Sequence, residues 1–344
     1  MLEKPDISEA SILACVRDDY GLPFNQVTFL PWGADRDTAV YRGTTDDGTG
    51  YFLKLRRGTF DEMTIAVPKL LHDQGIQQVI APIVTRSGAL WADLGQFKLT
   101  ISPFVEGRDG YTVTLSDQQW VEFGRAMKGI HTAQLPPSIR DQIQREVYSA
   151  QWRERVKGFQ VRAEETTFAD PVAAQFATFI KRERGAISRL VQRAEDLAAV
   201  MQTQSDRFVL CHADMHAGNA FIDGDDRFYI VDWDTLILAP KERDLMYVGG
   251  GQFCNHRTPD EEERLFYQGY GPTDADPVGL AYYRYERIVQ DIAEYCAMIL
   301  LTEEGGADRE NGARQLQSQF GPGGVVELAY RSEQFLPAEL RSES

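Results

Sequence analysis

The segment VLCHADMHAGNAFID, residues 209–223, constrains this 344-residue chain more than any other stretch. Asp214 and Asn219 stand five residues apart in it, between two β-like runs, and a second acidic cluster, IVDWD, follows at 230–234. Such polar groups between short strands are typical of three arrangements, namely a metal hydrolase, a phosphotransferase and a plain tight turn. The residues elsewhere in the chain discriminate among the three.

A phosphotransferase gives the carboxylates and the amide of this segment distinct roles. Phosphoryl transfer needs a carboxylate that orients the attacking hydroxyl and accepts its proton, and it needs oxygen ligands for Mg²⁺ beside the triphosphate. Asp214 fits the first role, while the Asn219 amide oxygen and Asp232, at the end of the run FYIVD, fit the second. Mg²⁺ suits this set because it is a hard cation that takes few protein oxygens and keeps phosphate and water as further ligands.

The two other interpretations explain less of the chain. A zinc hydrolase would use His212, Asp214 and His216, whose alternation would direct them to one side of a strand. Such a site needs additional ligands, and the remaining histidines stand in no ligand-like cluster: His72, His131 and His256. A tight turn would use Asp214 and Asn219 as turn formers, which suits an isolated motif, whereas this motif has matching residues elsewhere.

The first hundred residues have the rhythm of a small sheet. After a helix-like opening at 6–20, short β-like runs lie at 27–30, 38–44, 51–55, 89–93 and 97–102. The segment TDDGTG between the second and third runs predicts a hairpin. A helix-like stretch over 60–75 ends on Gly75, a residue that suits a helix C-terminus.

Beyond SPFVEGRDG, at 102–110, helical periodicity dominates. Ser116 with Gln119 three residues later predicts a capping box, and long helices are expected within 138–203 and 259–335. Short strands at 208–232 hold the opening motif. We therefore predict an α+β fold with a small five-stranded N-terminal lobe (1–102), a hinge (103–110) and a larger, mainly helical C-terminal lobe (111–344).

Two features of the first lobe bear on nucleotide binding. Lys54 lies in the strand-like YFLKL, where a lysine is ordinarily a surface residue but where kinase-type phosphotransferases need one for the α- and β-phosphates. Glu62 is the nearest partner for it, although Pro68 is expected to kink or restart the helix, which would leave Glu62 as an N-terminal dipole residue. The expected phosphate loop, PWGADRDTAVYR, holds one glycine, Gly33, so its backbone N–H groups would have to cradle the phosphates.

The charge balance narrows the range of partners. The chain has 36 Lys and Arg against 52 Asp and Glu, and 36 − 52 gives a net charge of −16. This argues against nucleic acid and anionic membranes and is compatible with a cationic ligand. The start MLEKPDISEA has no apolar core, no run approaches the roughly 18 to 20 apolar residues of a membrane span, and the four cysteines form no CxxC pair. We expect a cytoplasmic monomer.

These motifs together resemble the aminoglycoside phosphotransferases, which share the bilobal protein-kinase-like fold and use ATP with Mg²⁺. The matching segments are HADMHAGN, IVDWD and PKERDL. The resemblance implies that Asp214 is the catalytic base, that Asn219 and Asp232 bind Mg²⁺, and that Lys54 binds ATP phosphates. It also implies that Asp244 braces the catalytic loop.

The hinge segment SPFVEG resembles the adenine-binding linker of that family. The resemblance implies that the Pro103 carbonyl and the Val105 N–H meet the adenine ring. Recognition through the backbone explains why side chains in such a linker can vary.

Within the family, LLHDQGI, APKERDLMYVGGG and YYRYERIVQDIAEY are similar to the subgroup that modifies spectinomycin. The implied reaction is transfer of the ATP γ-phosphate to a hydroxyl of this cationic aminocyclitol, which gives antibiotic resistance. Two alternatives remain. One is a small-metabolite kinase acting on choline, homoserine or a sugar, and the other is a catalytically weak nucleotide-binding regulatory protein.

Acidic residues are the candidates for binding such a dication, because attraction between charges strengthens as the local dielectric falls. Asp234 follows the metal-binding Asp232, and Asp291 and Glu294 lie in the helix expected at 280–300. Asp291 stands close to the buried stripe of that helix, near enough to line a cleft edge. The alternative is that Asp291 merely pairs with Arg287 at i, i+4 spacing.

Overall fold

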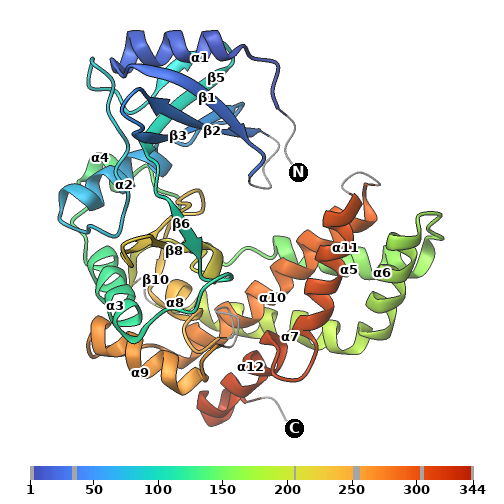
Figure 1. The fold of residues 1–344 in the computed structure, drawn as a ribbon. Coiled ribbons are helices and arrows are strands. Elements are labelled where there is room, and N and C mark those ends of the chain that lie inside the picture. Colours follow the sequence, from blue (N-terminus) through green and yellow to red (C-terminus); the bar gives the residue numbers. More distant parts are fainter. Residues whose placement is uncertain (1–3, 33–36, 205–206, 251–255, 303–305, 342–344) are drawn as a thin grey trace. The chain divides into compact units, whose positions relative to one another are not determined.

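The computed structural model describes residues 4–32, 37–204, 207–250, 256–302 and 306–341 (Figure 1). Packing divides the chain into two compact units. Unit 1 comprises Met1–Leu115, Thr132–Ile143 and Gly218–Leu236. Unit 2 comprises Ser116–His131, Gln144–Ala217 and Ile237–Ser344. The division into a nucleotide-binding lobe (1–102), a hinge (103–110) and a catalytic lobe (111–344) stays a prediction.

Unit 1 contains the predicted five-stranded sheet. Its strands are β1 (Phe24–Leu30), β2 (Thr38–Thr45), β3 (Gly50–Arg57), β4 (Ala92–Leu94) and β5 (Phe97–Pro103). All neighbours are antiparallel, in the order β1-β2-β3-β5-β4. The hairpin predicted from TDDGTG joins β2 to β3, with Val40 opposite Lys54. The sequence therefore predicted this sheet correctly.

One face of this sheet forms the core of the unit. It packs against α1 (Glu9–Cys15) and the π-helical turn that follows it (Val16–Tyr20), and the fully buried Leu53 and Leu55 of β3 lie on this side. Burying each leucine is worth about 1.5–3 kcal/mol, which fixes the register of β3. Because side chains alternate along a strand, Phe52, Lys54 and Arg56 project from the opposite face.

Helix α2 (Met63–Asp73) corrects one expectation, because it runs through Pro68 without restarting. A proline inside a helix costs about 3 kcal/mol through its missing N–H and its clash with the preceding turn. The buried stripe of Met63, Val67 and Leu71 offsets that cost. The helix ends as predicted at Gly75, whose φ of +91° is a left-handed conformation that glycine adopts readily.

A second sheet in unit 1 carries the C-terminal end of the opening motif. It consists of β6 (Gly107–Asp109), β8 (Ala220–Asp223) and β9 (Phe228–Ile230), with β8 in the centre. A 3-10 turn, Ala217–Asn219, leads into β8, and the Val231 N–H after β9 donates to the Asn219 carbonyl at 3.1 Å. The short helix α4 (Pro137–Arg140) also belongs to this unit.

Unit 2 is mainly helical. Its helices are α3 (Asp117–His131), α5 (Gln151–Glu165), α6 (Pro171–Arg182), α7 (Arg184–Met201), α8 (Glu242–Leu245), α9 (Pro259–Tyr270), α10 (Pro277–Leu300), α11 (Gly306–Gln319) and α12 (Val325–Arg331). Strands β7 (Phe208–Cys211) and β10 (Ile237–Pro240) pair antiparallel, and the 3-10 turns Ser332–Phe335 and Ala338–Leu340 follow α12. None of the helices in the described ranges is long and apolar enough to cross a membrane.

A local signal in the sequence predicted the start of α3. The capping box at α3 is present, because the Ser116 N–H donates to Gln119 Oε1 at 2.8 Å and the Gln119 N–H donates to Ser116 Oγ at 3.3 Å. Helices α3 and α9 cross closely, since a Cβ on Gly124 would lie 2.0 Å from the Phe266 carbonyl oxygen. A side chain at Gly124 would therefore force these two helices apart.

Candidate active site

A pocket of about 550 Å³ lies within unit 1. Its walls are mainly apolar and include Phe52, Ile80, Phe104 and Ile230, while its polar lining includes the following residues: Lys54, Thr100, Asn219, Asp232 and Asp234. Apolar walls with a few placed polar groups are typical of a small-molecule site. Predicted nucleotide, metal and substrate residues thus line one pocket, although they are up to 180 positions apart in the chain.

The hinge presents backbone groups to this pocket. The Phe104 N–H donates to the carbonyl of Gly50, the first residue of β3, at 3.1 Å. Because the two groups of a peptide unit point in opposite directions, the Pro103 carbonyl is directed away from β3. Pro103 and Val105 both line the pocket, as a linker that recognises adenine through its backbone requires.

Two cations of β3, Lys54 and Arg56, share one carboxylate. Lys54 Nζ lies 2.7 Å from Asp234 Oδ2, and Arg56 Nη1 lies 3.1 Å from the same oxygen. Alternation along β3 directs both cations to the pocket side of the sheet. Asp234, predicted as a substrate residue, is therefore the partner of the phosphate-binding candidate Lys54.

The two remaining nucleotide candidates have different outcomes. Glu62 occupies the position before the first turn of α2, and no hydrogen bond or ion pair joins it to Lys54 in the described ranges. Its position matches the alternative of a carboxylate beside the positive end of the helix dipole. Gly33 lies outside the residues that the structure describes.

The two predicted metal ligands flank the β8–β9 hairpin. Asn219 is 6% exposed and precedes β8, and Asp232 follows β9 with φ at +62°. Aspartate tolerates this left-handed conformation better than most residues, and such backbone strain is common at functional sites. An amide oxygen and a carboxylate that line the same pocket form a hard donor set, which fits Mg²⁺.

In unit 2 a buried carboxylate braces the loop that carries Asp214. Asp244 Oδ1 accepts the Ala213 N–H at 2.7 Å, and Asp244 Oδ2 accepts the His212 N–H at 2.9 Å. His131 Nε2 lies 3.0 Å from the same Oδ2. These contacts hold Ala213 at φ +69°, a conformation that alanine rarely adopts. The brace that the family resemblance implied for Asp244 is therefore present.

The two histidines of the motif, His212 and His216, are buried and partly buried, respectively. His212 is fully buried, and its Nδ1 accepts the Asp214 N–H at 3.3 Å. His216 Nε2 lies 3.5 Å from Asp214 Oδ2. His212 thus supports the loop from inside, and the His216 ring lies beside the Asp214 carboxylate.

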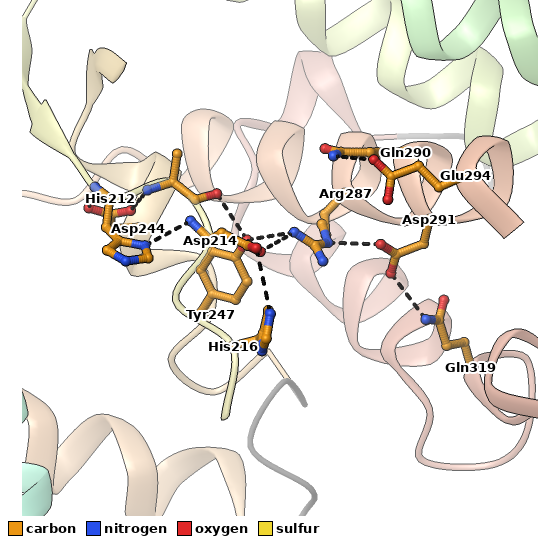
Figure 2. A network of polar contacts seen from close by, with 11 residues as sticks. His212, Asp214, His216, Asp244, Tyr247, Arg287, Gln290, Asp291, Glu294 and Gln319 are labelled. Atoms are coloured by element: carbon orange, nitrogen blue, oxygen red, sulfur yellow. Dashed lines mark hydrogen bonds and ion pairs between the residues drawn. The ribbon is translucent and has the colours of Figure 1, made fainter. Parts of the chain in front are cut away.

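Arg287 from α10 binds the predicted catalytic carboxylate, a contact that the sequence did not indicate (Figure 2). Its Nη1 lies 2.5 Å from Asp214 Oδ1, and the Tyr247 hydroxyl donates to the same oxygen at 3.2 Å. Burial by itself would raise the pKa of Asp214. The hydrogen bond from His216 and the charge of Arg287 outweigh that effect and hold this pKa below its usual range.

The predicted substrate residues of α10 both have partners within unit 2. Asp291 pairs with Arg287 at 2.9 Å, as the i, i+4 alternative expected, and it accepts a hydrogen bond from Gln319 at 3.0 Å. Glu294 accepts a hydrogen bond from Gln290 at 2.9 Å and is exposed. The substrate roles of both carboxylates stay predictions.

With this geometry, the chain matches a known family model. Residues 26–283 match the model described as the phosphotransferase enzyme family, which is more than half of the chain. The chain belongs to this family. The family-level resemblance predicted from HADMHAGN, IVDWD and PKERDL is therefore confirmed, and so is the α+β fold class.

Two similar solved structures are of spectinomycin phosphotransferase APH(9)-Ia. The complex with ADP and spectinomycin is 37% identical, with a TM-score of 0.89, and the match covers 96% of this chain and 100% of that one. The AMP-bound complex is 36% identical over 94% of this chain and 98% of that one, with a TM-score of 0.84. No curated protein sequence matches the chain.

More distant structures share the fold alone. The choline kinase LicA from Streptococcus pneumoniae is 17% identical, with a TM-score of 0.53, over 90% of this chain and 97% of that one. At this identity the likeness extends to the kinase-type phosphotransferase fold and not to the acceptor.

Proposed function

We propose that the protein transfers the γ-phosphate of ATP to a hydroxyl of an aminocyclitol antibiotic, with spectinomycin as its substrate. The observation that carries this proposal is the 37% identity, over nearly the whole of both chains, to an enzyme solved with ADP and spectinomycin. The net charge of −16 favours a cationic acceptor of this kind.

In this proposal the unit 1 pocket holds the nucleotide. Lys54 binds its phosphates, the Pro103 carbonyl and the Val105 N–H hold adenine, and Asn219 and Asp232 hold Mg²⁺. When bound, Mg²⁺ neutralises charge on the phosphate oxygens. The pocket residues themselves orient the nucleotide, because the hinge residues and Lys54 line the same pocket and are joined through the paired strands β3 and β5.

Asp214 orients the acceptor hydroxyl and takes its proton. Since the lowered pKa keeps this carboxylate ionised at neutral pH, Asp214 accepts a hydrogen bond from the hydroxyl and thereby directs an oxygen lone pair to the phosphorus. Asp234, Asp291 and Glu294 would supply negative charge for the ammonium groups of the substrate.

The test is turnover of purified protein with ATP and Mg²⁺ against spectinomycin, kanamycin, choline and homoserine. We expect mass spectrometry to detect singly phosphorylated spectinomycin and no phosphorylated product from the other three. Phosphorylated choline or homoserine would favour the metabolite-kinase alternative. ATP binding without turnover of any acceptor would favour the regulatory alternative.

A further inference from the structure

We propose that Arg287 is the positioning residue of the Asp214 carboxylate, and that Asp291 and Gln319 hold Arg287 in place. A chain of three polar contacts then links the end of α11 to the catalytic loop. This inference rests on the proposed function, since it takes Asp214 as the group that orients the acceptor hydroxyl.

The first contact fixes one oxygen of the carboxylate. Arg287 Nη1 lies 2.5 Å from Asp214 Oδ1 and 3.0 Å from the Tyr247 hydroxyl oxygen, and that hydroxyl lies 3.2 Å from the same Oδ1. The same hydroxyl oxygen lies 3.1 Å from the Ala213 carbonyl oxygen, so its single proton is shared between two acceptors on the loop. A planar guanidinium offers donors in a fixed geometry, so these three groups restrict rotation of the Asp214 side chain.

The second and third contacts hold the arginine. Arg287 Nε lies 2.9 Å from Asp291 Oδ1, one turn later on α10, and Gln319 Nε2 at the end of α11 donates to Asp291 Oδ2 at 3.0 Å (Figure 2). The side chains of Arg287 and Asp291 are only 16% and 9% exposed. In such surroundings the loss of one partner leaves an uncompensated charge, which is strongly unfavourable.

The groups around Asp214 explain what this arrangement does. His216 lies on the same loop, Arg287 approaches from α10, and Tyr247 approaches from the segment after α8. Asp291 faces Arg287 and not Asp214. Arg287 therefore contributes positive charge and orientation at the carboxylate, while Asp291 balances the charge of the arginine.

A purely structural ion pair of the same kind exists elsewhere in unit 2 and serves as a control. Arg193 of α7 binds Glu333 through two contacts, Nε to Oε1 at 2.6 Å and Nη2 to Oε2 at 2.8 Å. The two side chains are 13% and 16% exposed, which matches the burial of Arg287. Among the described residues Arg193 contacts Glu333 and the Leu340 carbonyl and does not contact the catalytic loop, so Arg193→Gln reports the cost of losing a buried pair away from Asp214.

The kinetic test compares Arg287→Gln, Arg287→Lys, Asp291→Asn, Gln319→Ala and Arg193→Gln across pH with ATP and spectinomycin. For Arg287→Gln we expect kcat to fall by about 10- to 100-fold, the worth of a hydrogen bond to a charged group, with KM for ATP unchanged. The acidic limb of its kcat profile should move to higher pH, because burial then acts on Asp214 with less opposing charge. Arg287→Lys, which keeps the positive charge, should lower kcat less and move the acidic limb less than Arg287→Gln does.

The loss of kcat should become smaller as the substituted residue lies further from Asp214, from Arg287 through Asp291 to Gln319. Asp291→Asn should lower kcat in the same direction as Arg287→Gln but less, because Arg287 keeps its charge and loses only a contact that holds it, and Gln319→Ala should lower kcat least. Arg193→Gln should lower the melting temperature and leave the acidic limb in place. An acidic limb of Arg287→Gln that superimposes on the parent profile, or one that Arg193→Gln moves equally, would overturn the proposal.

A second measurement separates this inference from the proposed function. Carboxyl ¹³C NMR of aspartate-labelled protein follows Asp214 directly, with its signal assigned by its loss in Asp214→Asn. The Asp214 signal should titrate at higher pH in Arg287→Gln than in the parent, whatever the acceptor. If Asp214→Asn keeps full turnover, the assignment of Asp214 as the base is wrong. If Asp214→Asn is inactive but Asp214 titrates at the same pH in Arg287→Gln and in the parent, only the role proposed for Arg287 is wrong.

Discussion

The two units balance the charges of their functional groups in opposite ways. In unit 1 one carboxylate, Asp234, is shared by two cations of β3, and the Lys54 and Asp234 side chains are 23% and 30% exposed. In unit 2 one cation, Arg287, is shared by Asp214 and Asp291 and is itself only 16% exposed. Partly exposed pairs are weak and exchangeable, whereas buried pairs are costly to break.

This difference fits the tasks that we propose for the two sites. A phosphate-binding lysine has to exchange its protein partner for a nucleotide at each cycle, and an accessible ion pair permits that exchange. A group that orients a hydroxyl has to keep its position during every cycle, and a buried network of fixed donors provides it. The contrast predicts that substitutions in unit 1 change nucleotide binding and that substitutions around Asp214 change kcat.

The largest expected effect is that of Asp214→Ala. Loss of a general base should lower kcat by roughly 10²- to 10⁴-fold, while the ATP affinity should barely change because Asp214 lies outside the unit 1 pocket. Steady-state kinetics with calorimetric ATP binding check both quantities. Turnover within a few-fold of the parent would remove Asp214 from the mechanism.

A second large effect is expected for Asp232→Asn. Replacing a charged oxygen ligand by a neutral one weakens binding of a hard cation, so the Mg²⁺ concentration at half-maximal turnover should rise sharply. A Mg²⁺ titration of activity at saturating ATP measures it, with Asp225→Asn, an exposed carboxylate of the β8–β9 turn, as control. An unchanged titration curve would exclude Asp232 from the metal site.

A smaller effect is expected for Asp234→Asn and sharpens the comparison directly. Removing the carboxylate leaves Lys54 and Arg56 without this competitor for phosphate, so ATP should bind equally well or up to about fivefold more tightly, as suits a partly exposed pair worth up to about 1 kcal/mol. Isothermal titration calorimetry measures the change. A raised KM for spectinomycin at unchanged ATP affinity would instead support Asp234 as a substrate residue.

The smallest expected effect concerns stability and tests a buried ion pair of unit 2. Burial raises the pKa of Glu286, which pairs with Arg153 at 3.4 Å, from 4.5 to about 7. Between these values the folded protein binds more protons than the unfolded chain, so Glu286 makes the free energy of unfolding fall as pH rises through this window. In Glu286→Gln this decrease should be shallower in chemical denaturation measured at each pH. An identical slope in parent and variant would contradict the raised pKa.

Local patterns predicted much of the fold. The β-like run YFLKL predicted the strand that carries Lys54, and Ser116 with Gln119 predicted the start of α3. These signals work because they depend on neighbours within a few residues, through strand pleat or helix capping. The expectation that α2 restarts at Pro68 was wrong for the opposite reason, because distant packing of α2 decides whether the helix continues through a proline.

The partners of the charged residues were beyond the reach of such patterns. Glu62, in the helix that follows β3, was the partner expected for Lys54, but the structure pairs Lys54 with Asp234, 180 positions away. Arg287 was considered only for Asp291 on its own helix, although it also binds Asp214, 73 positions away. Outside the i, i+4 spacing of a helix, an ion pair forms wherever folding brings opposite charges together, and the sequence separation of its two residues does not predict it.

By itself, the sequence determined the phosphotransferase family, the five-stranded sheet and the residue types that the chemistry needs, because each follows from a short motif or a local period. The tertiary structure alone decided which charges meet. The apolar cores of the sheet and of α10 fix the backbone, and the charged side chains then pair with whatever the packed backbone places within reach. That is why Asp234 faces Lys54 and Arg287 holds Asp214.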